Sequence, residues 1–355
     1  KEELIVDKNL KMRKCLLSKK IKHIDLKKNK SVNQILNSFH NTSFQSRNLA
    51  RCFSVFKSML ADKDAIIFFG LSGALVPGGM RKVIVDMIEL NMIDVLVSTG
   101  ANLYHDFFES EGHHHYVGTN SIDDSKLREL RIDRIYDTFA DDILFLKTDD
   151  FFINLPNELE KRYYSTREFL EELGKRIKDP NSITRAAYKS GTPIFCPTIH
   201  DSGIGIGLSV YCANNKSDNK FGLDLLKDNI EMLQIDKLAR KTGVFYVGGG
   251  VPKNYIQQLE PMLEVHGHKS KGHQYAIQIT TDDAKWGGLS GCTFEEAKSW
   301  GKVEDYTRTA TVHIDATIGL PLLVAAVMEE KDLLKNRKER KFVWNGSKLK
   351  QIKFI

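Results

Sequence analysis

The sequence predicts an α/β protein with a largely parallel β-sheet that is covered by helices on both faces. Short apolar segments recur along the chain, and segments with helical spacing of apolar residues lie between them. Continuous apolar runs are typical of strands buried on both faces, and their alternation with helices is typical of parallel sheets. The predicted strands are Ala65–Phe69, Asp94–Ser98, Pro193–Cys196, Gly243–Val247, Tyr275–Ile279 and Thr311–Ile314.

Helices are predicted from apolar spacing and from capping residues. Ser165 and Glu168 form a capping-box pattern ahead of a helix that ends near Gly174. Near the end of the chain, Asn345-Gly346 lies between two apolar segments and is typical of a β-hairpin turn. The other predicted helices are Val32–Asn37, Arg47–Leu60, Met80–Leu90, Glu295–Lys298 and Leu320–Met328.

The charge of the chain is unevenly distributed. The net charge is +6 over 355 residues, yet residues 1–30 carry +7, residues 329–355 carry +5, and residues 31–328 carry −6. We therefore predict a basic, partly helical N-terminal arm (1–30), one large α/β domain (31–328) and a basic C-terminal tail with the hairpin (329–355). Solvated charged ends explain the basic segments better than nucleic-acid binding does, and an acidic body suits a cationic ligand.

Cysteine usage and hydropathy indicate a cytoplasmic protein. The five cysteines are scattered and form no CxxC pair, which argues against a disulfide framework and against a zinc site. The longest apolar runs, Ala65–Val76 and Ile318–Met328, are too short to cross a bilayer. The first thirty residues lack the pattern of a secretory signal. We expect no membrane partner.

Glycine, hydroxyl and carboxylate residues follow nearly every predicted strand. Ligands of parallel sheets bind at the carboxyl ends of the strands, so this repeated composition predicts a binding site there. The segments are Gly70-Leu71-Ser72-Gly73, Thr99-Gly100-Ala101-Asn102, Asp201-Ser202-Gly203, Gly248-Gly249-Gly250, Thr280-Thr281-Asp282-Asp283 and Asp315-Ala316.

Each of these features also has a structural interpretation. Gly248–Gly250 precedes a helix and suits a pyrophosphate, but it is not a GxGxxG motif, and a tight strand-to-helix turn has the same pattern. Asp201 and Asp315 could bind a ribose hydroxyl or an ammonium group, or could cap the next helix. Lys302, in Ser299-Trp300-Gly301-Lys302, could be a desolvated nucleophile or a surface lysine at a helix end. The residues alone leave these alternatives open.

Histidines give no metal site. Consecutive side chains in His113-His114-His115 point in different directions, and no further ligand follows at a suitable spacing, so a loop is predicted. No nucleophile elbow, P-loop or zinc ligand set is present in the sequence.

Three segments in the right order and spacing resemble the deoxyhypusine synthase family. They are Gly248–Gly250 ahead of Val251-Pro252-Lys253, then Ser299-Trp300-Gly301-Lys302, and then Asp315-Ala316 followed by Leu320-Pro321-Leu322-Leu323. Phe44-Gln45-Ser46-Arg47-Asn48-Leu49 resembles a further family segment. The resemblance covers roughly residues 31–328.

The resemblance implies a Rossmann-like homotetramer with NAD bound between paired subunits. In the family's reaction NAD takes hydride from spermidine, 1,3-diaminopropane leaves, and the butyl group passes as an imine to a lysine, here Lys302. An acceptor amine then displaces it, and the same NADH returns the hydride. By position, the implied NAD contacts are Thr99, Gly100, Ala101, Asp201, Gly249, Gly250, Thr281, Asp315 and Ala316, and the implied substrate contacts are His105, Asn254, Glu296 and Trp300.

Departures from the family pattern concern the acceptor. Where family members have acidic polyamine anchors, this chain has His105, Ile206 and Leu289, and Asp106, Asp282 or Asp283 would have to replace them. The segments Thr99–Asp106 and Tyr164–Glu168 are more similar to the bacterial deoxyhypusine synthase-like branch. Some proteins of that branch make homospermidine.

The sequence thus favours spermidine-dependent aminobutyl transfer with putrescine as acceptor, slightly ahead of a lysine of the hypusine-containing translation factor. Two other classes stay open: an inactive regulatory paralogue, and a simple NAD-dependent dehydrogenase that forms no lysine imine. Retention of Lys302, Asp315 and the three glycines argues against the first of these.

Overall fold

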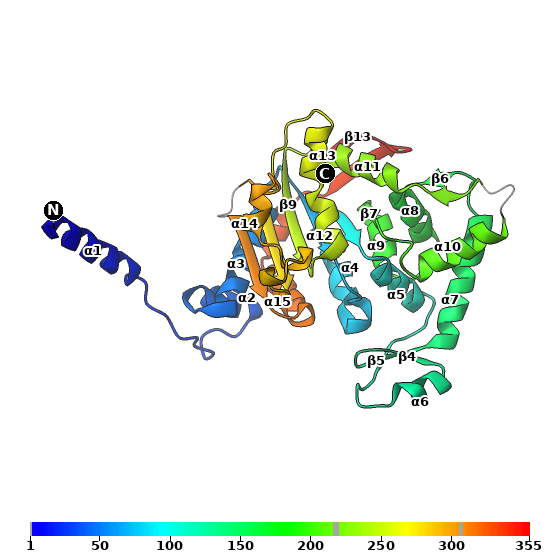
Figure 1. The fold of residues 1–355 in the computed structure, drawn as a ribbon, viewed down its shortest axis with the longest axis horizontal. Coiled ribbons are helices and arrows are strands. Elements are labelled where there is room, and N and C mark those ends of the chain that lie inside the picture. The colour runs from blue at the N-terminus through cyan, green and yellow to red at the C-terminus, as the bar shows by residue number, and fades with distance from the viewer. Residues whose placement is uncertain (1, 216–219, 305–307) are drawn as a thin grey trace.

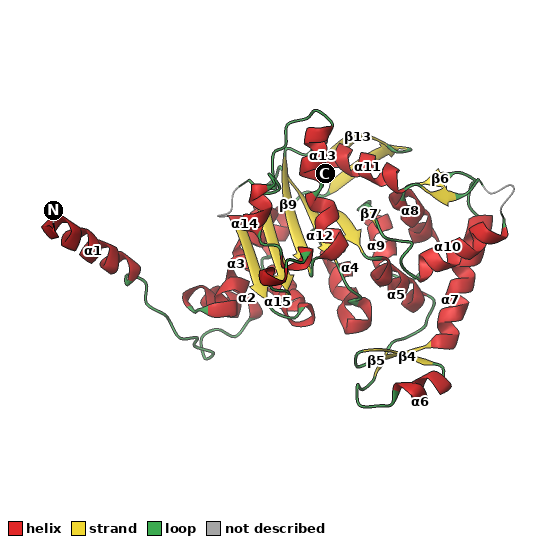
Figure 2. Cartoon of the chain, in the orientation of Figure 1, coloured by secondary structure: helices red, strands yellow, loops and turns green. Residues whose placement is uncertain are grey.

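A six-stranded parallel sheet forms the centre of the molecule (Figures 1 and 2). The computed structural model describes residues 2–215, 220–304 and 308–355. All six predicted strands are present, with ends that differ from the prediction by one or two residues, and the predicted fold class is confirmed. In sheet order they are β11 (Thr309–His313), β10 (Tyr275–Thr280), β9 (Lys241–Val247), β1 (Ala65–Leu71), β2 (Val95–Ser98) and β7 (Ile194–Phe195).

Strand order reverses at β1. From β1 the chain proceeds outward through β2 to β7, and it then returns to β9 on the other side of β1 and proceeds outward through β10 to β11. Phe68 of β1 therefore pairs with Val95 of β2 and with Val244 of β9. Such a reversal separates the loops at the carboxyl ends of the two central strands and is the usual ligand site of an open α/β sheet.

Alternate residues of the strands face two separate apolar layers. Ile67 and Phe69 of β1 point into the larger layer, and Phe68 points into the smaller one. Each layer buries apolar side chains of helices, which explains why the strands are continuous apolar runs. The larger layer includes α3 (Phe44–Ala61), α4 (Arg81–Glu89) and α15 (Ala316–Met328); the smaller includes α11 (Leu225–Leu238), α12 (Gly250–Gln257), α13 (Leu259–Val265) and α14 (Phe294–Ser299).

The segment between β2 and β9 adds structure that sequence analysis largely missed. A small antiparallel sheet lies below the main body in Figure 1, next to α6. The small sheet consists of β3 (Tyr116–Val117), β5 (Thr138–Asp141) and β4 (Ile132–Ile135). Besides β7 and α11, the other α-helices and strands of the segment are α5 (Gly100–Ser110), α6 (Asp124–Glu129), α7 (Asp142–Asn154), β6 (Tyr163–Tyr164), α8 (Thr166–Arg176), α9 (Ile183–Ser190), α10 (Gly203–Asn214) and β8 (Gly222–Leu223).

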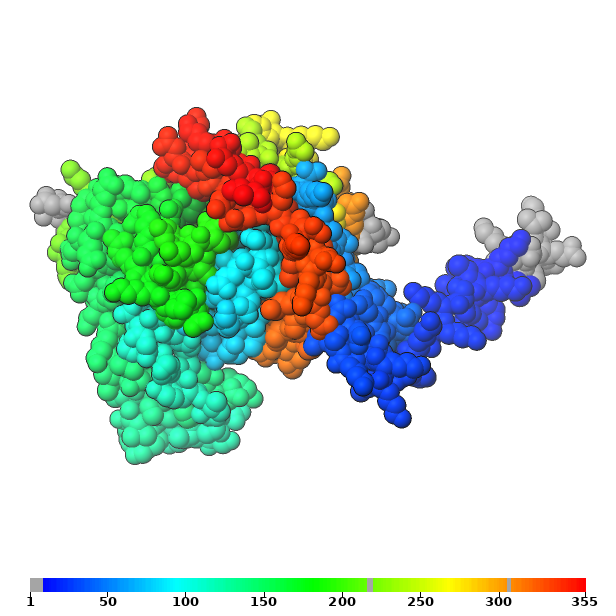
Figure 3. Space-filling model, turned by 180° about the vertical axis from the view of Figure 1, so that it is seen from behind, coloured from blue at the N-terminus to red at the C-terminus, as the bar shows by residue number. Residues whose placement is uncertain are grey.

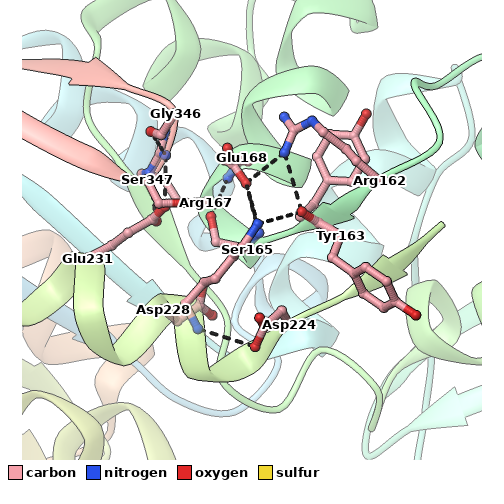
Figure 4. Close-up of polar contacts among 12 residues, drawn as sticks. Arg162, Tyr163, Ser165, Arg167, Glu168, Asp224, Asp228, Glu231, Gly346 and Ser347 are labelled. Carbon is pink, nitrogen blue, oxygen red and sulfur yellow. Dashed lines mark hydrogen bonds and ion pairs between the residues drawn. The ribbon is translucent and has the colours of Figure 1, made fainter. Parts of the chain in front are cut away.

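The capping box at the start of α8 is confirmed (Figure 4). Ser165 Oγ accepts a hydrogen bond from the Glu168 amide at 3.1 Å, and Glu168 Oε2 accepts one from the Ser165 amide at 3.0 Å. Beside it, the buried Arg167 makes two hydrogen bonds to Glu231 and one to the carbonyl of Gly346. These contacts tie α8 to α11 and to the C-terminal hairpin.

The predicted hairpin is also present. It consists of β12 (Arg340–Asn345) and β13 (Lys348–Phe354), it follows α16 (Lys331–Asn336), and Gly346 takes the positive φ of +59° that its turn needs. The amide and carbonyl of the Gln234 side chain bond Ser347 and Leu349. The hairpin is therefore packed on α11, and Figure 3 shows it spread over the body as the red segment.

The N-terminal arm contains α1 (Glu2–Leu16), which an extended segment joins to α2 (Val32–Ser38). Figures 1 and 3 show the arm projecting from the body. None of the helices in the described ranges combines the length and hydropathy that crossing a bilayer requires. All five cysteines are free.

Candidate active site at the carboxyl ends of the strands

The three glycines form the turn from β9 into α12, next to the end of β1. Gly248 and Gly250 have φ values of +69° and +54°, a region that disfavours residues with a Cβ atom. The Gly248 amide donates to Ile279 O at 2.8 Å, and Ser72 Oγ donates to Gly249 O. The turn is thereby fixed between β1 and β10, with the first amides of α12 at the reversal point of the sheet.

Close packing makes the middle glycine necessary. A Cβ atom at Gly249 would lie 2.3 Å from Ser290 Cα, and Ser290 Oγ accepts a hydrogen bond from the Gly250 amide at 2.9 Å. The 288–292 segment thus lies directly against the turn. The structural interpretation is confirmed, since the glycines form a tight strand-to-helix turn. Pyrophosphate binding at the start of α12 stays a prediction.

We expect Gly249→Ala to weaken NAD binding strongly. The added methyl group must displace the Ser290 backbone, and overpacking of this kind costs about 1–3 kcal/mol. Calorimetric titration with NAD and a urea unfolding curve measure the two effects. Gly288→Ala is the matched control, because no atom lies within 4 Å of its Cβ position and its φ is −73°. Unchanged NAD affinity in Gly249→Ala would show that the turn is not part of the cofactor site.

A second loop meets the site from β2. Thr99 caps α5, and its hydroxyl donates to Gly73 O at 2.7 Å. A Cβ atom at Gly100 would lie 2.5 Å from Ser202 Oγ, so the start of α5, which includes Ala101, lies against the loop that contains Asp201. The structure therefore brings together the predicted residues of these two loops.

The ends of β10 and β11 contribute exposed polar groups. Thr281 and Asp315 are exposed, and Ala316 is half-buried at the first position of α15. Asp315 caps α15, as its structural interpretation requires, but both hydrogen bonds from Thr317 go to Oδ1. Oδ2 makes no bond within the described chain and is free for a ligand hydroxyl.

Lys302 follows α14 and is buried although it lies beside exposed residues. The residue is 9% exposed, and Nζ lies 5.3 Å from the ring centroid of Trp300. Its backbone is held on both sides, since the amide donates to Ala297 O at 3.1 Å and the carbonyl accepts from the His273 amide at 3.0 Å. Nζ makes no hydrogen bond or ion pair to another described residue. The amine is thus buried without a hydrogen bond or ion pair to a described residue, and this burial excludes the interpretation as a surface lysine.

Lys253 is a second buried lysine that sequence analysis did not single out. It is 0% exposed on α12, and Nζ donates to Gln278 Oε1 at 3.0 Å and to Cys292 O at 2.6 Å. Burial lowers the pKa of Lys253 to about 8, and the positive charge of Lys302 acts in the same direction. Lys253 is the fourth residue of α12 and follows the glycine turn directly. Its position directly after the Gly-rich turn was the available signal.

Three of the predicted substrate contacts surround this pair of lysines. Glu296 and Trp300 are exposed on and after α14, and Asn254 is half-buried next to Lys253. The carboxylates of Glu296 and Asp282 both act on the pKa of Lys253 in the opposite direction to burial. The Lys302 amine thus faces the Trp300 ring, and the two carboxylates act on its neighbour in charge, Lys253.

His105 lies in a different environment. It is buried in α5, where Nδ1 is 2.9 Å from His115 Nε2 and the ring packs at 5.6 Å against Phe145. Burial, followed by the charge of His115, lowers the pKa of His105 to about 3. The imidazole is neutral at physiological pH. Its contacts are with His115, in the loop before β3, and with Phe145 of α7, rather than with the lysines. His115 lies in the loop predicted for the histidine triplet.

Asp106 is excluded as a replacement anchor. Its side chain is 0% exposed and accepts hydrogen bonds from Arg81 and from the N-terminus of α9, so no oxygen faces a ligand. Asp283 is exposed, caps a short 3₁₀ helix and pairs with Lys285 at 2.9 Å. Asp282 is exposed and makes no side-chain bond to a described residue, so it is the best placed of the three.

Comparison with known proteins agrees with these motifs. The family model "Deoxyhypusine synthase" matches residues 34–327. "Probable deoxyhypusine synthase 2" of Methanosarcina acetivorans is 45% identical over 323 residues, which cover 90% of this chain and 92% of that protein. A "Deoxyhypusine synthase-like protein" of Chlorobaculum parvum is 42% identical, with coverage of 92% and 94%.

A solved structure shows the same fold. A crystal structure assigned to deoxyhypusine synthase from Entamoeba histolytica aligns with a TM-score of 0.60 at 19% identity, and covers 86% of this chain and 96% of that one. The identities above 40% and the family match over most of the chain agree with the Rossmann-like sheet. The chain therefore belongs to the deoxyhypusine synthase family, whose members are NAD-dependent enzymes that transfer the aminobutyl group of spermidine.

Proposed function

We propose that the chain transfers the 4-aminobutyl group of spermidine through an imine on Lys302 to a free diamine. The observation that supports this most is the Lys302 amine, which is buried, unbonded within the described chain and 5.3 Å from the Trp300 ring centroid. An imine forms only when an uncharged amine attacks an electrophilic carbon, so a nucleophilic lysine must be shielded from bulk water.

NAD, when bound, supplies the hydride acceptor that oxidises the carbon next to the secondary amine of spermidine and later returns the hydride. We assign its binding to the loops at the carboxyl ends of the strands. The glycine turn fits the pyrophosphate, and Asp315 Oδ2 and the Asp201 carboxylate fit ribose hydroxyls. The assigned residues are Thr99, Gly100, Ala101, Asp201, Gly249, Gly250, Thr281, Asp315 and Ala316.

Spermidine binding is assigned to the surroundings of Lys302. The Trp300 ring is 67% exposed and can cover an ammonium or methylene group, while Glu296 and Asp282 can bind the charged ends. Asn254 is assigned a supporting polar contact. His105, although predicted as a substrate contact, can serve only if a ligand or subunit enters the region around α5.

We further propose a homotetramer in which paired subunits close the site. Large apolar side chains are exposed beside the carboxyl ends of the strands, and monomers seldom expose such groups together. Ile206, Trp286 and Ile318 are 58%, 77% and 54% exposed. A facing subunit would cover them and exclude water from Lys302.

Putrescine is the favoured acceptor, which gives homospermidine, ahead of a lysine of the hypusine-containing translation factor. The chain replaces family anchors by His105, Ile206 and Leu289, and it is similar both to archaeal proteins named deoxyhypusine synthase and to bacterial deoxyhypusine synthase-like proteins. Asp282 offers one anionic anchor for a small diamine.

The acceptor test is a product analysis. Purified chain, spermidine and NAD are incubated with putrescine, with the translation factor, or with both, and products are identified by mass spectrometry. We expect homospermidine without any protein acceptor, and reduced homospermidine with Asp282→Asn because an ammonium anchor is lost. Deoxyhypusine on the translation factor without homospermidine would instead identify a strict deoxyhypusine synthase.

A further inference from the structure

Behind the Lys302 segment lies a buried cluster of three groups that can bind a metal ion. Asp236 comes from α11, Glu260 from α13, and His273 from the loop just before β10. They are 2%, 1% and 0% exposed, and one oxygen or nitrogen atom from each lies within 4.8 Å of the other two. The cluster is at the amino end of β10, so it is separate from the strand ends where the cofactor site is assigned.

In this cluster, polar atoms are buried without partners. Asp236 Oδ2, Glu260 Oε1 and His273 Nε2 make no hydrogen bond to the described chain. Neither carboxylate forms an ion pair with a described lysine or arginine, and Glu260 Oε1 lies 3.8 Å from His273 Nδ1. Buried carboxylates are normally paired or bound to metal, because desolvating an unpaired charge is costly.

Outer hydrogen bonds hold two of these groups in fixed orientations. Glu260 Oε2 accepts bonds from Ser270 Oγ at 2.7 Å and from the amides of Lys271 and Gly272 at 2.9 Å each. His273 Nδ1 is 2.8 Å from Thr242 Oγ1. Each group therefore satisfies one atom outside the cluster and leaves another unbonded, which is the arrangement around a metal ligand.

We propose that Asp236, Glu260 and His273 bind one divalent metal ion of the Zn²⁺ type. Two carboxylates balance the charge of the ion, and an imidazole nitrogen among the donors favours Zn²⁺ over Mg²⁺ or Ca²⁺, which prefer oxygen ligands and more of them. With bonds of about 2 Å, ligand atoms are at most ~4 Å apart, so small side-chain rotations complete the site. A water molecule can supply the fourth ligand.

The metal site would stiffen the backbone that carries Lys302. The His273 amide donates to Lys302 O, and His273 also forms a parallel bridge with Val303. Ser270, which is bonded to Glu260, lies 3.5 Å from Gly301 O. An ion bound by Glu260 and His273 thus fixes the loop on which the Gly301–Val303 segment rests.

Metal analysis of the untagged 355-residue chain tests the proposal without any activity assay. Protein expressed with added zinc is passed through a desalting column and analysed by plasma mass spectrometry. We expect about one Zn²⁺ per chain, and loss of most of it in Asp236→Asn and in His273→Gln. Chelator treatment should lower the midpoint temperature of thermal unfolding, and Zn²⁺ but not Mg²⁺ should restore it.

Two controls separate this site from others. The double variant His113→Ala/His114→Ala lacks two of the three consecutive histidines, and it should bind as much zinc as the wild type. The Asp282→Asn variant should also bind as much zinc as the wild type. Substitution with Co²⁺ should give the visible absorption bands of a four-coordinate ion in the wild type, which avoids dependence on variants that fold poorly. Wild-type protein that contains no zinc and binds no Co²⁺ after refolding with the ion would overturn the proposal. So would equal zinc content in wild type and both cluster variants.

Discussion

We expect Lys302→Ala to abolish aminobutyl transfer. The rate of product formation should fall roughly 10³-fold or more, which is the usual effect of removing a covalent nucleophile. The buried amine is bonded to no other described residue, so its removal breaks no hydrogen bond and leaves the fold intact. The measurement is formation of the transferred product from spermidine and NAD, together with borohydride reduction of the wild type. Borohydride should fix a spermidine-derived adduct on Lys302, detected by peptide mass spectrometry.

Lys285→Ala is the matched control for that experiment. Lys285 is an exposed lysine of the same region and pairs with Asp283, so its removal should leave both the transfer and the adduct unchanged. Polyamine turnover that persists in Lys302→Ala would remove the nucleophile assignment and would favour the dehydrogenase alternative. Absence of all turnover in the wild type, with spermidine and NAD still bound, would favour a regulatory paralogue.

The sheet was predictable because its strands are buried on both faces. Strands in that environment are continuous apolar runs, so Ala65–Leu71 and Lys241–Val247 are visible from composition alone. The strands of the small antiparallel sheet are two to four residues long and partly exposed, as in Tyr116–Val117, and they leave no such run. Sequence patterns therefore located the main sheet and missed the insertion after α5.

The candidate site was predictable where it depends on backbone turns, and not where it depends on side-chain direction. The glycines at 248–250 predict the turn, because the positive φ of Gly248 and Gly250 is a local property of the backbone. Burial of Lys253 is not local, since its partners Gln278 and Cys292 come from other segments. The Asp236, Glu260 and His273 cluster was likewise invisible, because its three members are separated in sequence by 24 and 13 residues.

Helix α5 shows the same limit. His105 and Asp106 follow the Thr99–Ala101 loop closely, and sequence spacing allowed either to face the polyamine. In the structure α5 is packed against both α9 and α10, so both side chains are buried within the fold. Five hydrogen bonds to the Asp106 carboxylate, from Arg81, Ser182, Ile183 and Thr184, show that this residue holds elements together.

Asp106→Ala should therefore destabilise the protein by about 3–5 kcal/mol, as expected when one member of a buried, hydrogen-bonded ion pair is removed. The substitution removes the carboxylate to which Arg81 Nε donates at 2.8 Å, and leaves the first amides of α9 without their acceptor. Arg81 keeps its contact with Asp179, which places the effect toward the lower end of that range. Urea unfolding followed by circular dichroism measures the free energy of unfolding.

The control for this prediction is Asp282→Asn, which removes an exposed carboxylate near the lysines. We expect the opposite pattern from the two variants: Asp106→Ala lowers stability but keeps the Michaelis constant for spermidine in the fraction that stays folded, whereas Asp282→Asn keeps stability and raises that constant. Should Asp106→Ala leave the unfolding curve unchanged and weaken spermidine binding instead, Asp106 would be a polyamine anchor after all. The buried network around α9 would then have to open when substrate binds.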